Sequence, residues 1–235
     1  HFTDRRQRQM CIRDRLLHHI GKNNFKYFMS TIFYYANGWK QLSDTLLKKS
    51  YSSVFVLVDH NTKSHCLSYF DQHFSHPYAL LTMDAGEANK HIGTCEQLWS
   101  SMSEQGADRN SLLINLGGGV VTDLGGFVAC TYKRGIDFIN IPTSLLAMVD
   151  ASVGGKTGVD FHGLKNQIGI IREPAFVVID DSFLTTLPSN EFRSGYAEML
   201  KHGLIADADY FSNLATEKLN EKSTISNYIR HSVEI

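Results

Sequence analysis

The sequence predicts an α/β protein in which a parallel sheet, covered by helices on both faces, is followed by the first helices of an α-helical domain. Three observations support this fold class. Short apolar runs alternate with helix-length segments between residues 54 and 179, a Gly-Gly-Gly turn joins one such run to a helical segment, and only helical patterns follow Pro188. Repeated strand–helix–strand units produce a parallel sheet with helices on both faces.

The predicted elements begin near Thr31. Residues 1–29 are interpreted as a disordered or non-native leader, because residues 4–15 are rich in Arg and have no periodicity. An apolar run to Tyr35, a turn at Gly38 and an amphipathic stretch to Lys49 come next. The continuous β-branched run Val54–Asp59 predicts a buried strand. Further strands are predicted at 78–83, 111–116, 136–141 and 175–179.

The helical part is predicted over 189–204, 207–218 and 222–235, with Ser189 as the N-cap of its first helix and Gly203 as the stop. We therefore divide the chain into an α/β domain at 30–188 and the first helices of an α-helical domain at 189–235. Because the sequence starts at His1 without Met and stops inside a helical pattern, we expect a fragment.

Composition excludes several classes of protein. The chain has 235 residues, 43% of them hydrophobic, with 23 Lys and Arg against 24 Asp and Glu. This balance predicts no general attraction to nucleic acid or anionic lipid. No apolar run approaches the roughly 20 residues that span a bilayer, and the cysteines form no C-x-x-C pair, which argues against a zinc ribbon. We expect a cytoplasmic protein with reduced thiols.

The glycine-rich turn is the first candidate site. The strand ending at Leu116 leads directly into Gly117-Gly-Gly and then a helix. Glycines there allow backbone N–H groups to approach a pyrophosphate at the positive end of the helix dipole, as in Rossmann-like domains. The spacing G-G-G-x-x-x-D differs from the usual G-x-G-x-x-G, and a plain tight turn is equally compatible with it.

A second polar stretch follows the strand at 136–141. Its Gly-Gly-Lys-Thr is similar to a P-loop, but Asp150 stands where a P-loop requires Gly. What remains is a hydroxyl pair, an acid and a lysine presented by glycines. These residues are Thr143, Ser144, Asp150 and Lys156, with Lys165, Asn166 and Arg134 as further candidates. Such lysines are often only solvated, but together with Asn166 and Arg134 they would form a cradle for an anionic substrate.

The third candidate site is the helix that begins near Ser189. Glu191, Glu198 and His202 fall on one of its faces, with Lys201 beside them. A carboxylate and an imidazole four residues apart suit a metal. A solvated face with a Glu198–Lys201 ion pair explains the same spacing.

Six motifs follow one another in the sequence: Gly117-Gly-Gly-Val-Val-x-Asp123, Thr131-Tyr-x-Arg134-Gly, Ile141-Pro-Thr-Ser-Leu-Leu, Val149-Asp-x-Ser-Val-Gly-Gly-Lys-Thr, Lys165-Asn-x-Ile-Gly and Gly195-x-Ala-Glu-Met-x-Lys201. In order and spacing they resemble the 3-dehydroquinate synthase family, which belongs to the sugar phosphate cyclase superfamily, and the resemblance covers the chain from about residue 54 to the end. The block from Asp150 to Lys156 is the most specific.

The resemblance implies a fold and an activity. Family members pair a nucleotide-binding α/β domain with an α-helical domain and hold the active site between them. They use catalytic NAD and a divalent metal, usually zinc with cobalt as the alternative, to convert 3-deoxy-D-arabino-heptulosonate 7-phosphate to 3-dehydroquinate and phosphate on the shikimate route to chorismate and the aromatic amino acids. The implied steps are oxidation, phosphate elimination, reduction, ring opening and aldol closure.

The resemblance also implies residue roles. NAD would be held by Asp59, Glu87, Lys90, Gly117, Gly118, Gly119, Val120, Asp123, Thr143, Ser144, Leu146, Lys165, Phe183, Thr186, Leu187 and Glu191, with Asp59, Glu87 and Lys90 on the adenosine side. The substrate would be bound by Asp150, Lys156, Asn166 and Lys201. Glu198 would be a metal ligand, and Arg134 would reach the substrate phosphate of the neighbouring subunit in a homodimer.

Some residues depart from the family pattern. Ala151 stands where Ser is common, Ser144 where Thr is common, and His202 where Tyr is usual, so His202 is not assigned as a metal ligand. The family's metal-binding histidines come from a later segment. We therefore expect the 235 residues alone to be inactive. A related sugar phosphate cyclase, a metal-dependent alcohol dehydrogenase and a non-catalytic NAD-binding remnant are the alternatives.

Overall fold

The computed structural model describes residues 31–216 and 222–235. The leader predicted at residues 1–29 and the end of the helix predicted at 207–218 lie outside the described residues.

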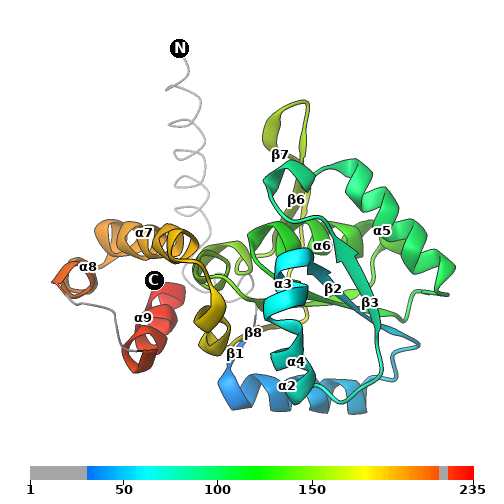
Figure 1. Ribbon diagram of the computed structural model, residues 1–235, viewed down its shortest axis with the longest axis horizontal. Coiled ribbons are helices and arrows are strands. Elements are labelled where there is room, and N and C mark those ends of the chain that lie inside the picture. Colours follow the sequence, from blue (N-terminus) through cyan, green and yellow to red (C-terminus); the bar gives the residue numbers. More distant parts are fainter. Residues whose placement is uncertain (1–30, 217–221) are drawn as a thin grey trace, which may run out of the picture.

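A six-stranded parallel sheet forms the centre of the α/β region, as the sequence predicts (Figure 1). Its strand order is β1-β8-β5-β4-β2-β3, and every pairing is parallel. The strands are β1 (Ile32–Tyr34), β2 (Val54–Asp59), β3 (Ala79–Met83), β4 (Leu112–Gly117), β5 (Asp137–Pro142) and β8 (Val177–Ile179). Each of the five strands predicted between residues 54 and 179 is confirmed.

Helices cover both faces of the sheet, because its central strands are apolar on both sides. Val56 and Val58 of β2 join one buried cluster, and Phe55 and Leu57 join the other. The first cluster packs against α2 (Tyr35–Lys48) and α4 (Leu67–His73), and the second against α5 (Ile92–Glu104) and α6 (Gly119–Thr131). Short helices α3 (His60–His65), η2 (Glu87–Asn89), η3 (Tyr132–Arg134) and η5 (Asp181–Thr186) complete the connections.

Gly38 lies inside α2, so the turn predicted there is wrong. A Cβ atom at this position would lie 2.5 Å from Cγ1 of Val178 in β8. Gly38 therefore allows close approach of α2 to the sheet, a packing requirement that local sequence cannot distinguish from a turn.

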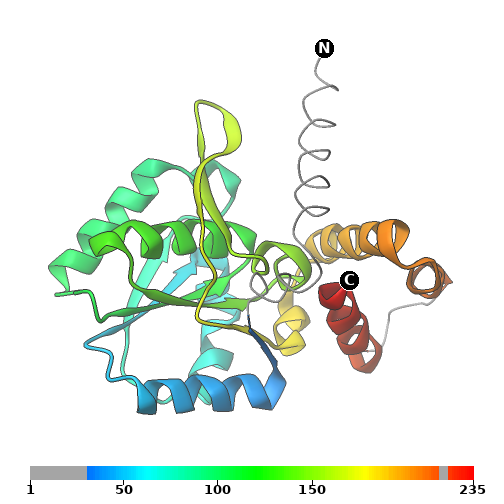
Figure 2. The ribbon, with the colours of Figure 1, turned by 180° about the vertical axis from the view of Figure 1, so that it is seen from behind.

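An antiparallel hairpin, β6 (Lys156–Phe161) and β7 (Leu164–Ile171), follows the glycine-rich stretch and is absent from the prediction. His162 and Gly163 form its two-residue turn, with φ of +49° and +74°, as a type I′ turn requires. The hairpin lies along α6 and projects beyond it (Figure 2). Every residue of β7 is exposed.

Three helices follow residue 188, as predicted: α7 (Ser189–Ala206), α8 (Ala208–Thr216) and α9 (Lys222–Glu234). They lie together at one end of the molecule (Figure 1). Met199, Leu214 and Ile229 are buried in the same apolar cluster as one face of the sheet.

The predicted start of α7 is confirmed, but its predicted cap and its predicted end differ from the structure. Ser189 is its first residue and makes no capping hydrogen bond. The helix also continues past Gly203, where a Cβ atom would lie 2.9 Å from the backbone of Phe211 in α8. Gly203 therefore provides close packing between α7 and α8.

Candidate nucleotide and phosphate site

The sheet provides a crevice at the carboxyl ends of β2 and β4. These strands are neighbours, but the chain leaves β2 toward β3 on one side and later continues through β4 and β5 on the other. In open parallel sheets, ligands bind where the strand order reverses in this way. Asp59 ends β2 and Gly117 ends β4, so the two predicted cofactor residues flank this position.

The predicted glycine turn forms the amino end of α6. Gly118 is the N-cap, and no side chain caps the helix. Cβ atoms on Gly118 and Gly119 would lie 3.3 Å from Oγ of Ser144 and 3.2 Å from Cβ of Ala151. The N–H of Thr143 donates to the Gly117 carbonyl at 3.0 Å. The first N–H groups of α6, including that of Val120, therefore lie at a narrow opening that suits an anion.

Asp59 is fixed by a capping box at the start of α3. Its Oδ1 accepts from the N–H of Thr62 at 2.7 Å and from the Thr62 hydroxyl at 2.9 Å. Among the described residues, no group bonds to Oδ2 of Asp59, which leaves that oxygen for a ligand such as a ribose hydroxyl.

Lys90, Asp123 and Asn166 form one cluster, which the sequence prediction did not connect. The Lys90 ammonium lies 2.5 Å from Oδ2 of Asp123 and 2.7 Å from Oδ1 of Asn166, and Lys90 is only 3% exposed. Burial raises the pKa of the Asp123 carboxyl, and the charge of Lys90 opposes this rise. The cluster joins the residue that follows η2 to α6 and β7.

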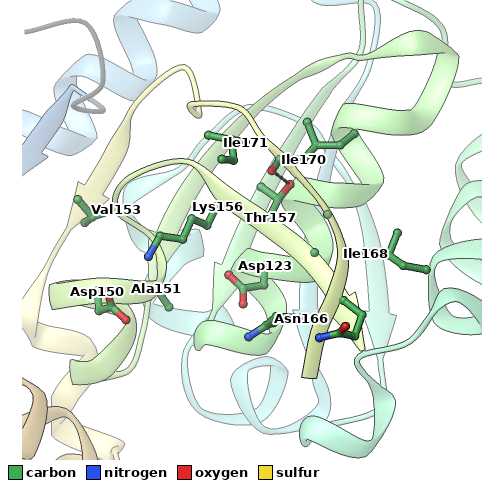
Figure 3. Close-up of a pocket in the computed structure, with 13 residues that line it drawn as sticks. Asp123, Asp150, Ala151, Val153, Lys156, Thr157, Asn166, Ile168, Ile170 and Ile171 are labelled. Atoms are coloured by element: carbon green, nitrogen blue, oxygen red, sulfur yellow. Dashed lines mark hydrogen bonds between the residues drawn. The ribbon is translucent and has the colours of Figure 1, made fainter. Parts of the chain in front are cut away.

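A cavity of about 670 Å³ opens beside this cluster. It brings together Asp123, Asp150, Lys156 and Asn166, all predicted from the sequence (Figure 3). Their side chains point toward a common space. Asp150 reaches it from η4 (Ala147–Ala151), a single π turn of the kind frequent at functional sites. Further lining residues are Ala151, Val153, Thr157, Gly158, Gln167, Ile168, Gly169, Ile170 and Ile171.

Lys156 is the cation best suited to bind an anion in this cavity. Lys90 is paired with Asp123, Lys165 with Glu87 at 3.1 Å, and Lys201 with Glu198. Within residues 31–216 and 222–235, no carboxylate lies within ion-pair distance of the Lys156 ammonium. An exposed lysine without an acidic partner is free to form an ion pair with an incoming phosphate.

The remaining predicted cofactor residues come from segments near the carboxyl ends of β5 and β8. A Cβ atom on Gly195 would lie 2.4 Å from the backbone nitrogen of Leu146, so α7 packs directly on this segment. Phe183 is buried in η5. Glu191 is exposed in the first turn of α7 and accepts from Asn190 at 3.0 Å. Thr186 and Leu187 end η5 and lead into α7.

The predicted metal ligand, Glu198, lies on α7 beside Lys201 and His202. Its Oε1 atom accepts a short hydrogen bond from Lys201 and lies 3.3 Å from Nε2 of His202. The other ring nitrogen of His202 bonds to the Ser232 hydroxyl at 2.8 Å. Both contacts engage Oε1, so Oε2 remains for a ligand. In the part of the chain that the structure describes, no group of three His, Cys, Asp or Glu side chains is arranged to hold a metal.

Arg134 is not among the residues that line the cavity. It follows the carboxyl end of α6, whereas the glycine turn forms the amino end, and a helix of this length spans about 20 Å. Its φ of +71° holds it in a left-handed turn before Gly135. The structure therefore does not bring Arg134 together with Lys156 and Asn166 in the same cavity.

Sequence reasoning predicted Lys156 and Asn166 but missed the other hairpin residues that line the cavity, among them Thr157, Ile168 and Ile170. One signal was present: His162-Gly163 is a two-residue turn between segments that lack helical periodicity. The exposed β7 strand gives no continuous apolar pattern that would mark it as a core strand.

Comparisons with known proteins agree with this geometry. The fold and site define a Rossmann-like protein with the architecture of the sugar phosphate cyclases. A crystal structure of 2-deoxy-scyllo-inosose synthase, complexed with carbaglucose-6-phosphate, NAD+ and Co2+, superposes with a TM-score of 0.74 at 20% identity over 88% of this chain and 61% of that chain. The 2-epi-5-epi-valiolone synthase from Streptomyces hygroscopicus, with NAD+ and Zn2+ bound, gives 0.72 at 28% identity over 87% and 59%.

The sequence matches define the family more narrowly. Residues 80–194 match the family described as 3-dehydroquinate synthase N-terminal. The 3-dehydroquinate synthase of Parabacteroides distasonis is 48% identical over 175 residues, which cover 74% of this chain and 50% of that protein. The chain belongs to the 3-dehydroquinate synthase family and spans about half the length of the curated relatives that it matches. None of the described helices is long and apolar enough to cross a membrane.

Proposed function

We propose that this chain forms the NAD-binding part and half of the substrate site of a 3-dehydroquinate synthase, which converts 3-deoxy-D-arabino-heptulosonate 7-phosphate to 3-dehydroquinate and phosphate. One observation carries the proposal. The uncapped amino end of α6 and the cavity holding Lys156 and Asn166 lie side by side, so a nucleotide and a phosphorylated substrate can be bound next to each other.

In this proposal, residues of this chain bind and orient the nucleotide and the substrate. The backbone of Gly118 and Gly119 receives the pyrophosphate, and Asp59 accepts from a ribose hydroxyl through Oδ2. Lys156 and Asn166 hold the substrate phosphate, and Asp150 accepts from a substrate hydroxyl at the cavity rim. When bound, NAD would supply hydride transfer and a divalent metal would supply Lewis-acid polarisation of a substrate oxygen.

Glu198 would be one ligand of that metal. Carboxylate oxygens are suitable ligands for zinc, and the two similar structures carry Co2+ and Zn2+. Catalytic zinc sites have three protein ligands, and Glu198 is the one that we assign within the described residues. We therefore propose that the 235 residues alone bind NAD without turnover. We also propose that the whole enzyme works in the cytoplasm.

Calorimetric titration with NAD tests the cofactor assignment. Wild type should bind, whereas Gly118→Val should lower the affinity at least tenfold, because a side chain there prevents close backbone approach to the pyrophosphate. Gly93→Val, near the start of α5 and outside the proposed site, is the control and should retain affinity. Equal affinities for wild type and Gly118→Val would show that the pyrophosphate assignment is wrong.

A related sugar phosphate cyclase is the second candidate, because the 2-epi-5-epi-valiolone synthase is 28% identical and shares the fold. Product analysis with a chain of the relatives' full length and several ketose phosphates would separate the two activities. Formation of 3-dehydroquinate from the seven-carbon substrate is expected. A cyclic product from another ketose phosphate alone would favour the second candidate.

The position of Arg134 adds a second subunit to the proposed active site. Because it lies beyond the opposite end of α6 from the glycine turn, we assign it to the phosphate site of a second subunit in a homodimer. Subunits with Arg134→Ala, mixed with subunits with Lys156→Ala in the full-length protein, should regain part of the lost activity. Absence of any rescue would contradict a shared site.

A further inference from the structure

Lys90 is a lysine in an unusual environment. Lysine is almost never fully buried unless it is paired, yet Lys90 is 3% exposed. Its ammonium lies 2.5 Å from Asp123 and 2.7 Å from Asn166. Two of the three donors of this ammonium are therefore engaged by protein partners.

The contact with Asn166 fixes the orientation of its side-chain amide. An ammonium has three donors and no acceptor, so the amide atom that faces it must be the oxygen. The two donors on Nδ2 are consequently left for another partner. Asn166 is among the side chains that line the cavity (Figure 3), so its Nδ2 donors are available to a ligand there.

The backbone of Asn166 is also linked to Lys90, through Asp160. The N–H of Asn166 donates to Oδ1 of Asp160 at 2.8 Å, and the N–H of Asp160 donates to the Lys90 carbonyl at 2.8 Å. Asn166 has φ of +53°, a conformation that Asn tolerates better than most residues. Lys90 thus contacts the hairpin through both its main chain and its side chain.

We propose that Lys90 is a positioning residue that holds the Asn166 amide with its Nδ2 donors available to a phosphate oxygen in the cavity. The same ammonium binds Asp123, one turn along α6 from the glycine turn, so Lys90 links the phosphate site to the nucleotide site. This inference rests on the proposed function to the extent that the ligand in the cavity is a phosphate group.

A double-mutant cycle tests the role of Lys90. Inorganic phosphate affinity is measured by calorimetry for wild type, Lys90→Met, Asn166→Ala and the double variant, each checked for folding by circular dichroism. Lys90→Met and Asn166→Ala should each lower the affinity about tenfold, and the double variant should be no weaker than Asn166→Ala. Losses that multiply in the double variant, or unchanged affinity in Lys90→Met, would overturn the proposal.

A second measurement needs no variant at Lys90. In wild type labelled with ¹⁵N, the side-chain amide signals of Asn166, assigned by their absence in Asn166→Ala, should shift on addition of phosphate. Phosphate binding without any shift of these signals would overturn the proposal even if Lys90→Met does not fold. Wild type that binds no phosphate would also overturn it.

The NAD titration distinguishes a failure of the proposed function from a failure of the role assigned to Lys90. Wild type that binds phosphate with the expected cycle but binds no NAD contradicts the proposed function alone. If wild type binds NAD but the losses of phosphate affinity multiply in the double variant, only the assignment of Lys90 is contradicted.

Discussion

The six-stranded sheet and the β6–β7 hairpin are both β structures, but they are stabilised in different ways. The central strands of the sheet are buried on both faces, whereas every residue of β7 is exposed. Fully burying a large apolar side chain contributes about 1.5–3 kcal/mol, and the sheet contains many such residues. The hairpin is held by close backbone approach at glycines, by burial of Val159 in the apolar cluster that includes α6, and by polar contacts to Glu87 and Lys90. The cavity lies between the hairpin, α6 and η4.

The largest effect is expected where α6 packs on the sheet. A Cβ atom at Gly125 would lie 2.1 Å from Oδ1 and 2.6 Å from Cγ of Asn115, whose amide is buried and bonded to Asn140. Gly125→Ala should lower the free energy of unfolding by about 3 kcal/mol or more, because it crowds a packed layer and disturbs that hydrogen bond. Urea unfolding measures the change.

Gly93→Ala is the matched control for Gly125→Ala. Gly93 is also helical, but its added Cβ atom would contact only the imidazole of His91, at 3.2 Å. Since Ala favours a helix over Gly by about 1 kcal/mol, this variant should unfold at equal or higher urea concentration. Similar losses in both variants would mean that α6 does not depend on close contact with the sheet.

A smaller effect is expected where α6 packs on the hairpin. A Cβ atom at Gly126 would lie 2.4 Å from Cγ2 of Thr157. Gly126→Ala should cost about 1–3 kcal/mol and increase amide exchange in β6 and β7. Thr157→Ser removes that methyl group and retains the hydroxyl that donates to Ile170, so the double variant should recover most of the loss. If it does not, the hairpin is not held by this contact.

The smallest effect is expected at the exposed end of the hairpin. Leu164 is 61% exposed, and Leu164→Lys should change the free energy of unfolding by about 0.5 kcal/mol or less, as surface substitutions usually do. Thermal unfolding of the wild type and the variant checks this. A loss greater than about 1.5 kcal/mol would show that another surface buries Leu164 in solution.

The same contrast explains which elements could be predicted. The run Val54–Asp59 is apolar because the strand is buried on both faces, so burial itself produces the sequence signal. In the hairpin, β7 is exposed throughout and β6 is buried only at its middle residues, so neither strand gives a continuous apolar run. Gly38, Gly195 and Gly203 show a related limit, since each fits a neighbour that is distant in the sequence or lies in another helix.

The sequence by itself determined the parallel α/β class, the glycine turn at a helix amino end, and the residue types suited to a phosphate: Lys156, Asn166 and Asp150. These follow from local periodicity, backbone freedom and side-chain chemistry. Only the tertiary structure decided that Lys90 joins Asp123 to Asn166, that Lys156 is left without an acidic partner in the described part of the chain, and that Arg134 lies apart from both. Pairing of charges depends on which segments the fold brings together, and the local sequence does not determine the distance between those segments.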